Sequence, residues 1–157
     1  MKKNKNRVGF RSKGFTLIEI LLVIGIIAIL AGIVLVAINP SRQFKQARDS
    51  QRLSNVNAIL NAVGQNIADN RGVFVCSGNQ TEIPESPGQI MKSSGGFDIR
   101  PCLVPLYLSE IPHDPSVEST QGSYDTGYKI SRDTSTDRIT ISAMSEIEPS
   151  VSIEVTR

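Results

Sequence analysis

The sequence contains one unbroken apolar run, which begins at Ile20 and ends at Ile38. As a helix, about 19 residues at 1.5 Å each span roughly 28 Å, which matches the hydrocarbon core of a bilayer. The run therefore predicts one membrane-spanning helix. Glu19 stands directly before it, and a carboxylate inside lipid costs roughly 2.5–3.5 kcal/mol at the bilayer centre and less near an end. A residue with that cost usually has a partner.

A second helical pattern runs from Ser41 to Asn70. Its apolar residues recur at steps of three and four and form one stripe: Leu53, Val56, Leu60, Val63 and Ile67. Pro40 separates this pattern from the apolar run, and a proline inside a helix removes a hydrogen bond and kinks the helix. Alternatively, Asn39 caps a second helix that has Pro40 in its first turn. Gly72 is expected to end the helix.

The C-terminal half alternates short apolar segments with turn residues. Residues 77–100 are rich in glycine, proline and polar side chains and are interpreted as a loop. Residues 128–131, 139–143 and 151–155 alternate with period two and predict strands, with a turn at 133–137. The predicted fold class is α+β, a long N-terminal helix with a transmembrane half and an amphipathic half, packed against a small antiparallel sheet.

The residues around Glu19 resemble a known processing signal. Lys13-Gly14-Phe15-Thr16-Leu17-Ile18-Glu19, after a short basic leader, is similar to the class III signal of type IV pilins and pseudopilins. The resemblance implies that a prepilin peptidase cuts after Gly14 and that the new N-terminal residue, Phe15, is N-methylated. It also implies that Glu19 meets the N-terminal ammonium of a neighbouring subunit in the filament.

The same resemblance implies a division of the chain and a function. Residues 1–14 would be the leader, 15–39 the transmembrane and assembly helix, 40–72 an amphipathic helix on the globular domain, and 73–157 an extracytoplasmic domain. The implied protein is a structural subunit of a pilus or pseudopilus-like filament, single-pass in the cytoplasmic membrane and later part of a surface or periplasmic filament. The implied partners are further copies, prepilin peptidase, the inner-membrane assembly machinery and, before assembly, lipid.

The charge distribution separates the leader from the rest of the chain. The leader holds six of the 17 Lys and Arg residues and none of the 15 acidic residues, so its removal changes the formal net charge from +2 to −4. By the positive-inside rule, this predicts a leader in the cytoplasm and a C-terminus outside. Charge gives no reason to expect contact with nucleic acid.

Other interpretations of the N-terminal region compete with this one. The leader taken alone is also compatible with a solvated basic tail. A secretory signal peptide has a shorter apolar region and a small-residue cleavage site, whereas residues 35–39 form a poor one. A plain membrane anchor explains the length but not Gly14 or Glu19. The alternative function is therefore a membrane-tethered binding domain without an assembly role, which would tolerate changes at both residues.

The two cysteines, Cys76 and Cys102, both lie on the predicted external side. An even number of cysteines outside the cytoplasm predicts one disulfide. A closed loop of about 27 residues contributes roughly 3.5 kcal/mol in the chain-entropy model. Two buried free thiols are the alternative.

A second stretch resembles the major pseudopilins of type II secretion. Ile111-Pro112-His113-Asp114-Pro115, followed by Gly127-Tyr128, is similar to their Leu-Pro-x-Asp-Pro…Gly-Tyr stretch, although Ser116 replaces the tryptophan often found there. Related pseudopilins bind calcium in loops, which makes Asp114, Asp125, Asp133 and Asp137 candidate ligands. Solvated turn aspartates are the alternative, because calcium needs six to eight oxygen ligands. No other cofactor is expected.

Two further groups of residues are interpreted as structural or surface features. Arg42, Lys45, Arg48 and Arg52 are interpreted as a solvated face or a contact with lipid headgroups, with pairing to another subunit's acidic domain as the alternative. His113, the sole histidine, is expected to cap a turn. The sequence shows no nucleophile elbow around a serine, no metal quartet and no phosphate loop, so an enzyme is not predicted.

Overall fold

The computed structural model describes residues 14–117 and 123–157, so most of the predicted leader lies outside the described residues. The chain divides after Pro40 into two units, which are described separately. The first unit contains helix α1, Leu17–Ala37. None of its residues is buried, and its large apolar side chains are 45–89% exposed.

Helix α1 is apolar on every side. Among the described residues it is the one helix long and apolar enough to cross a membrane. A helix that is apolar all round belongs in lipid or inside a larger protein assembly. Its composition therefore calls for an apolar partner.

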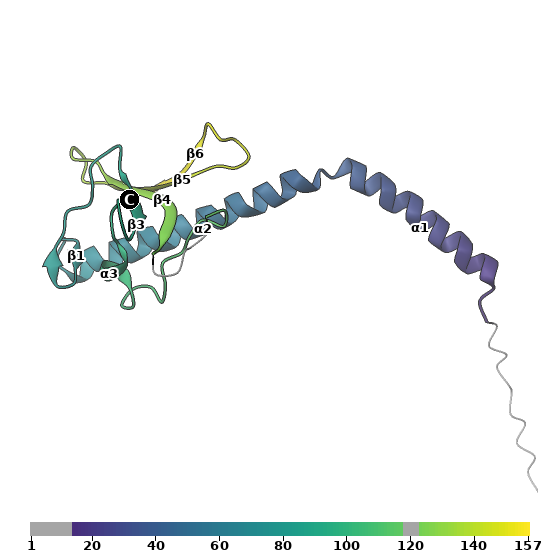
Figure 1. Cartoon of the computed structure of the whole chain (residues 1–157), viewed down its shortest axis with the longest axis horizontal. Helices are drawn as coiled ribbons and strands as arrows, with labels where there is room; N and C mark the ends of the chain where they lie inside the picture. The colour runs from purple at the N-terminus through teal and green to yellow at the C-terminus, as the bar shows by residue number, and fades with distance from the viewer. Residues whose placement is uncertain (1–13, 118–122) are drawn as a thin grey trace, which may run out of the picture. The chain divides into compact units, whose positions relative to one another are not determined.

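The second unit, residues 41–157, is called the α2 unit. It contains helix α2, Pro40–Asp69, from the second residue of that helix onward (Figure 1). Pro40 is its first residue, a position where the missing N–H costs no helical hydrogen bond. Of the two arrangements that the sequence allowed, the structure shows separate helices with residues 38 and 39 between them. The C-terminal end is closed by Gly72, which has a φ of +91° and donates its N–H to the Ile67 carbonyl at 2.8 Å.

Strands cover one side of α2 (Figure 1). Four antiparallel strands form a sheet in the order β3 (Gln89–Lys92), β4 (Asp125–Arg132), β5 (Ile139–Met144) and β6 (Ser152–Thr156). A separate hairpin pairs β1 (Val75–Cys76) with β2 (Asn79–Gln80), and α3 (Arg100–Leu103) is a single turn. The predicted α+β class is confirmed, but the interpretation of residues 77–100 as loop is wrong for β2 and β3, which are too short for a clear alternation.

The core lies between α2 and the inner face of the sheet. Its fully buried side chains include Val56, Ile59 and Val63 of α2 and Tyr128, Ile130 and Ile141 of the sheet. The predicted apolar stripe of α2 is correct for Val56, Leu60 and Val63. It is wrong at Leu53, which is 45% exposed, whereas the neighbouring Arg52 is only 3% exposed. At this point the inner face of α2 therefore carries Arg52 in place of the predicted Leu53.

Candidate functional site

The predicted cleavage site lies just before α1. Gly14 and Phe15 are both exposed, and Phe15 is 78% exposed. A Cβ added at Gly14 would meet no atom within 4 Å. Both residues of the predicted cut are thus accessible, as a protease substrate must be. Cleavage between them stays a prediction.

Glu19 takes part in the first turn of α1. Thr16 is the N-cap, and its Oγ1 accepts a hydrogen bond from the Glu19 N–H at 3.3 Å. In return, the Thr16 N–H donates to Glu19 Oε2 at 3.5 Å. This reciprocal pair is a capping box, which satisfies two backbone donors at a helix start. Thr followed three residues later by Glu is the sequence signal for a capping box. From the sequence, Glu19 was considered only as a pairing residue, and this cap was not predicted.

A second set of polar contacts lies in the α2 unit, around Arg52. Its Nε and Nη2 donate to the two carboxylate oxygens of Asp114 at 2.7 and 2.9 Å. Its Nη1 donates to Asp49 at 2.6 Å and to Glu146 at 3.3 Å. Two parallel bonds to one carboxylate fix both distance and orientation. Arg52 therefore holds two loops, 111–117 and 145–151, against α2.

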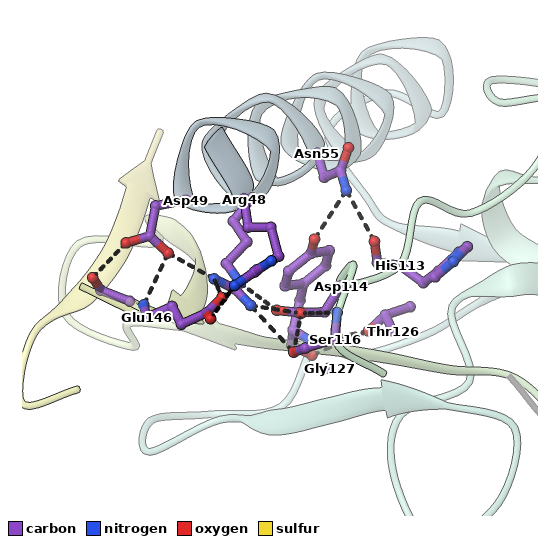
Figure 2. A network of polar contacts seen from close by, with 12 residues as sticks. Arg48, Asp49, Asn55, His113, Asp114, Ser116, Thr126, Gly127 and Glu146 are labelled. Atoms are coloured by element: carbon purple, nitrogen blue, oxygen red, sulfur yellow. Dashed lines mark hydrogen bonds and ion pairs between the residues drawn. The ribbon is translucent and has the colours of Figure 1, made fainter. Parts of the chain in front are cut away.

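Asp49 orders the loop between β5 and β6 (Figure 2). Its carboxylate accepts hydrogen bonds from the Ser145 hydroxyl at 2.7 Å and from the backbone N–H groups of Glu146 and Ile147 at 2.9 and 3.2 Å. Glu146 in turn pairs with Arg48. The loop is thus tied to two successive turns of α2 by side chains of both charge signs.

The electrostatics of this network favour the ionised carboxylates. Partial burial raises the pKa of Asp49, but hydrogen bonds from Glu146, Ser145 and Arg52 outweigh it and lower the pKa to about 2. The same competition holds at Asp114, where burial is outweighed by the bonds from Arg52 and Ser116, and its pKa lies below the usual range. Both aspartates are therefore charged in the folded protein at neutral pH.

The pseudopilin-like stretch converges on this network. Asp114 binds Arg52, and the Tyr128 hydroxyl accepts a hydrogen bond from Asn55 Nδ2 at 2.9 Å (Figure 2). Gly127 has a φ of +71°, and a Cβ there would approach the Asp114 Cβ to 2.9 Å. Glycine is required at this position both by its conformation and by the closeness of the Asp114 turn. The His113 side chain is exposed, and only its carbonyl joins the network, accepting from Asn55 at 3.0 Å.

The structure corrects the interpretation of the basic patch. Arg52 is buried and Arg48 pairs with Glu146 of the same chain, so these two residues form neither a solvated face nor a headgroup contact. Lys45 is exposed and remains compatible with the earlier interpretation. The sequence could not reveal the pairing, because Arg48 and Glu146 lie 98 positions apart.

The far end of α2 is held by Asn66 and the disulfide. Cys76 of β1 and Cys102 of α3 are bonded. Asn66, 2% exposed, donates to the carbonyls of Val75 and Cys102 at 2.8 and 2.9 Å and accepts from the Val75 N–H at 2.9 Å. One buried amide thus connects α2 to both segments that carry the cysteines. Neither Asn66 nor Asn55 was identified from the sequence, because their spacing carries no motif.

The candidate calcium ligands do not form a cluster. Among the described residues, no group of three or more His, Cys, Asp or Glu side chains could hold a metal ion. Asp125 caps its own turn by accepting from the Gly127 N–H at 2.8 Å, and Asp133 does the same for Ser135 at 2.8 Å. Asp114 is occupied by Arg52. The alternative interpretation as turn aspartates describes Asp125 and Asp133.

Comparison with known families identifies the N-terminal segment. Residues 9–35 match the family model described as the prokaryotic N-terminal methylation motif, which is the prepilin-type cleavage and methylation motif of type IV pilins. Searches of curated proteins and of solved structures gave no match. The match covers Gly14, Phe15, Thr16 and Glu19 but not the α2 unit, so it defines the class of the leader and first helix.

Proposed function

We propose that the chain is the precursor of a structural subunit of a type IV pilus or pseudopilus-like filament. The observation that carries this proposal is the prepilin motif at residues 9–35, placed at the start of a helix whose apolar side chains are all exposed. Such a helix can use lipid as its first partner and other copies of itself as its second. The motif implies a structural rather than a catalytic protein.

The role of Glu19 follows from charge. Cleavage after Gly14 would leave a free ammonium on Phe15, four residues before Glu19. When the helices associate, this ammonium is buried and needs an opposite charge, because an unpaired buried charge costs several kcal/mol. Glu19 of a neighbouring copy supplies it. Repetition of such a heterologous contact does not close and therefore produces a fibre.

The test is processing followed by assembly, with the full chain expressed beside its own prepilin peptidase and assembly machinery. Intact-mass analysis should show that the leader is gone and that one methyl group is added to Phe15. The variant Gly14→Leu should stay uncleaved, since a small residue is needed at the cut. An uncut wild-type chain, or a cut beyond Ile38, would refute the proposal and favour a tethered or secreted binding domain.

A further inference from the structure

At the end of the α2 unit where helix α2 begins, two large apolar side chains are exposed. Phe44, in the second turn of α2, is 64% exposed, and Met144, the last residue of β5, is 68% exposed. Among the described residues of this unit, Phe44 is the only exposed aromatic residue. Single exposed apolar residues are common on proteins in water, whereas a group of them marks a contact surface. Their significance therefore depends on whether they lie together.

Loop 145–151 brings these parts of the unit together, because it is fixed to the first half of α2. Glu146 of the loop pairs with Arg48 (Figure 2). Residues three or four positions apart in a helix lie on one face. Phe44 and Lys45 therefore lie one turn before Arg48, on the side of α2 that carries the loop.

A hollow of about 400 Å³ lies between this part of α2 and the loop. Lys45 lines it together with Met144 and Pro149, and Pro149 is exposed as well. Phe44, Lys45, Met144 and Pro149 thus form one surface at the start of α2, which we call the proximal surface. It combines three exposed apolar side chains with one exposed cation.

The charges of this end of the unit differ in whether they have a partner. Arg48 and Glu146 neutralise each other. Lys45 forms no ion pair with any residue in 14–117 or 123–157. Glu148 is the exposed acid of the loop. A layer of phospholipid headgroups contains phosphates for the cation and amines for the acid, so it complements both charges.

The length of the chain keeps the proximal surface near the end of α1. Only residues 38 and 39 separate the two helices. The step from Ile38 to Pro40 covers at most about 7 Å, and five residues of helix add about 7.5 Å. The Lys45 backbone therefore lies within about 15 Å of the end of the apolar run, whatever the angle between the helices. The headgroup layer is itself roughly 5–7 Å thick, and a lysine side chain extends several Å toward it.

We infer that the proximal surface rests on the headgroup layer of the membrane that holds α1, with Phe44 and Met144 at the boundary of the acyl chains and Lys45 on lipid phosphates. The inference rests on the membrane-spanning role of α1 in the proposed function. Lysine and aromatic side chains are the residues that suit this depth, because they have an apolar body and an attraction to the polar layer.

The bilayer is favoured over a second copy of the chain as the occupant of this surface. The two residues between the helices fix its distance from the proximal surface, whereas no described contact holds another copy at this end. The contact would hold the α2 unit on the membrane while α1 remains inserted. It would have to be released when α1 leaves the bilayer for a filament.

The direct test is the accessibility of a spin label at Met144→Cys in the full chain, reconstituted in vesicles of phosphatidylethanolamine and phosphatidylglycerol at high lipid excess. The native cysteines are bonded to each other, so only the new one is labelled. A water-soluble nickel complex, present on both sides of the membrane, should collide with this label about threefold or more less often than with one at Thr134→Cys, because polar reagents are excluded from the bilayer. Thr134 is exposed in the turn 133–137, and Asp137 of that turn lies beside Ile67, near the other end of α2.

A charge substitution tests the part that Lys45 plays. Lys45→Glu should raise the nickel accessibility of the Met144→Cys label to nearly that of Thr134→Cys, since the new carboxylate is repelled by lipid phosphates. Lys129→Glu makes the same change at an exposed position of β4 and should leave the accessibility unchanged. Phe44→Ser gives a second reading and should raise the accessibility as well. Near-UV circular dichroism shows that each variant is folded.

The outcomes separate this inference from the proposed function. Equal accessibility at Met144→Cys and Thr134→Cys, or protection that survives both Lys45→Glu and Phe44→Ser, would overturn the membrane contact and leave the filament function standing. Protection that disappears when the protein is diluted with lipid would identify another copy as the occupant and would also overturn the inference. Loss of the chain from the vesicles in an alkaline wash would show that α1 does not span the membrane and would overturn both.

Discussion

Helices α1 and α2 follow each other in the chain but satisfy their side chains in opposite ways. No residue of α1 is buried, and its only side-chain hydrogen bonds among the described residues are those of the capping box at Thr16 and Glu19. Helix α2 buries an apolar face against a sheet and pairs Arg48, Asp49 and Arg52 within its own unit. The apolar side chains of α1 have to be covered by the surroundings of the protein, whereas the inner face of α2 is covered by its own unit.

This difference teaches where substitutions should act. A change in α1 should leave the fold of the α2 unit intact and should affect insertion or assembly. A change in the Arg52 network should affect the stability of the α2 unit first. The three tyrosines, Tyr107, Tyr124 and Tyr128, all lie in the α2 unit of this tryptophan-free chain, so near-UV circular dichroism of the full protein in detergent reports on that unit.

The largest effect is expected at Glu19. Glu19→Gln keeps a side chain that can complete the capping box but removes the charge that we propose to pair with the Phe15 ammonium. Breaking a buried ion pair costs about 3–5 kcal/mol, and the loss recurs at every subunit, so filaments should be nearly absent while cleaved monomer accumulates in the membrane. The measurement compares membrane monomer with sheared filaments on immunoblots. Glu154→Gln, at an exposed carboxylate of β6, is the matched control, and normal filament yield from Glu19→Gln would favour a tethered domain.

The next effect is expected at Arg52. Arg52→Met leaves Asp114 and Asp49 without their main cation and should destabilise the α2 unit by about 3–5 kcal/mol. Urea unfolding followed by near-UV circular dichroism measures the change. Arg138→Met, at an exposed arginine, should change stability by less than about 0.5 kcal/mol. An equally small change for Arg52→Met would mean that the ion pairs of Arg52 contribute little to the free energy of unfolding.

Removal of the disulfide should have a somewhat smaller effect. The double variant Cys76→Ser, Cys102→Ser opens a loop whose ends are 26 positions apart, and it should destabilise the α2 unit by roughly 3.5 kcal/mol in the chain-entropy model. Cleavage after Gly14 should proceed as in the wild type, because α1 lies outside this unit. The same urea experiment measures the loss. Two alkylatable thiols in wild-type protein made in its own cells would contradict the disulfide.

The smallest effect is expected from acid. The pKa of Asp49 is lowered from 3.8 to about 2 by folding, so its ionised form stabilises the fold above pH 4, and this contribution is lost as the pH falls from about 4 to 2. The contribution is on the order of 1–2 kcal/mol once solvent screening is considered, and Asp114, with its lowered pKa, adds a loss of the same sign. Stability measured by urea unfolding between pH 7 and pH 2 should show this decline. Asp49→Asn should be less stable at neutral pH and should lose less on acidification, and an unchanged pH profile would contradict the assignment.

The features that the sequence determined are local in the chain. The apolar run from Ile20 to Ile38 and the residues Gly14, Phe15 and Glu19 stand within one segment, and each can be read from its neighbours. Alternation predicted strands at residues 128–131, 139–143 and 151–155, and the structure has them at 125–132, 139–144 and 152–156. Alternation depends only on which side chains face the core. The inner stripe of α2 was foreseen for the same reason, apart from Leu53.

The features that only the tertiary structure decided are long-range polar contacts. A helical pattern places Arg52 and Leu53 on adjacent positions at the edge of one stripe, and hydrophobicity alone selects Leu53. In the structure Arg52 is the buried residue of the two, because folding brings Asp114 and Glu146 to its guanidinium group. These partners lie 62 and 94 positions away in the sequence. Asn55 and Asn66 were hidden for the same physical reason. The value of a polar side chain depends on the partner that folding brings to it, and the sequence around that side chain does not contain the partner.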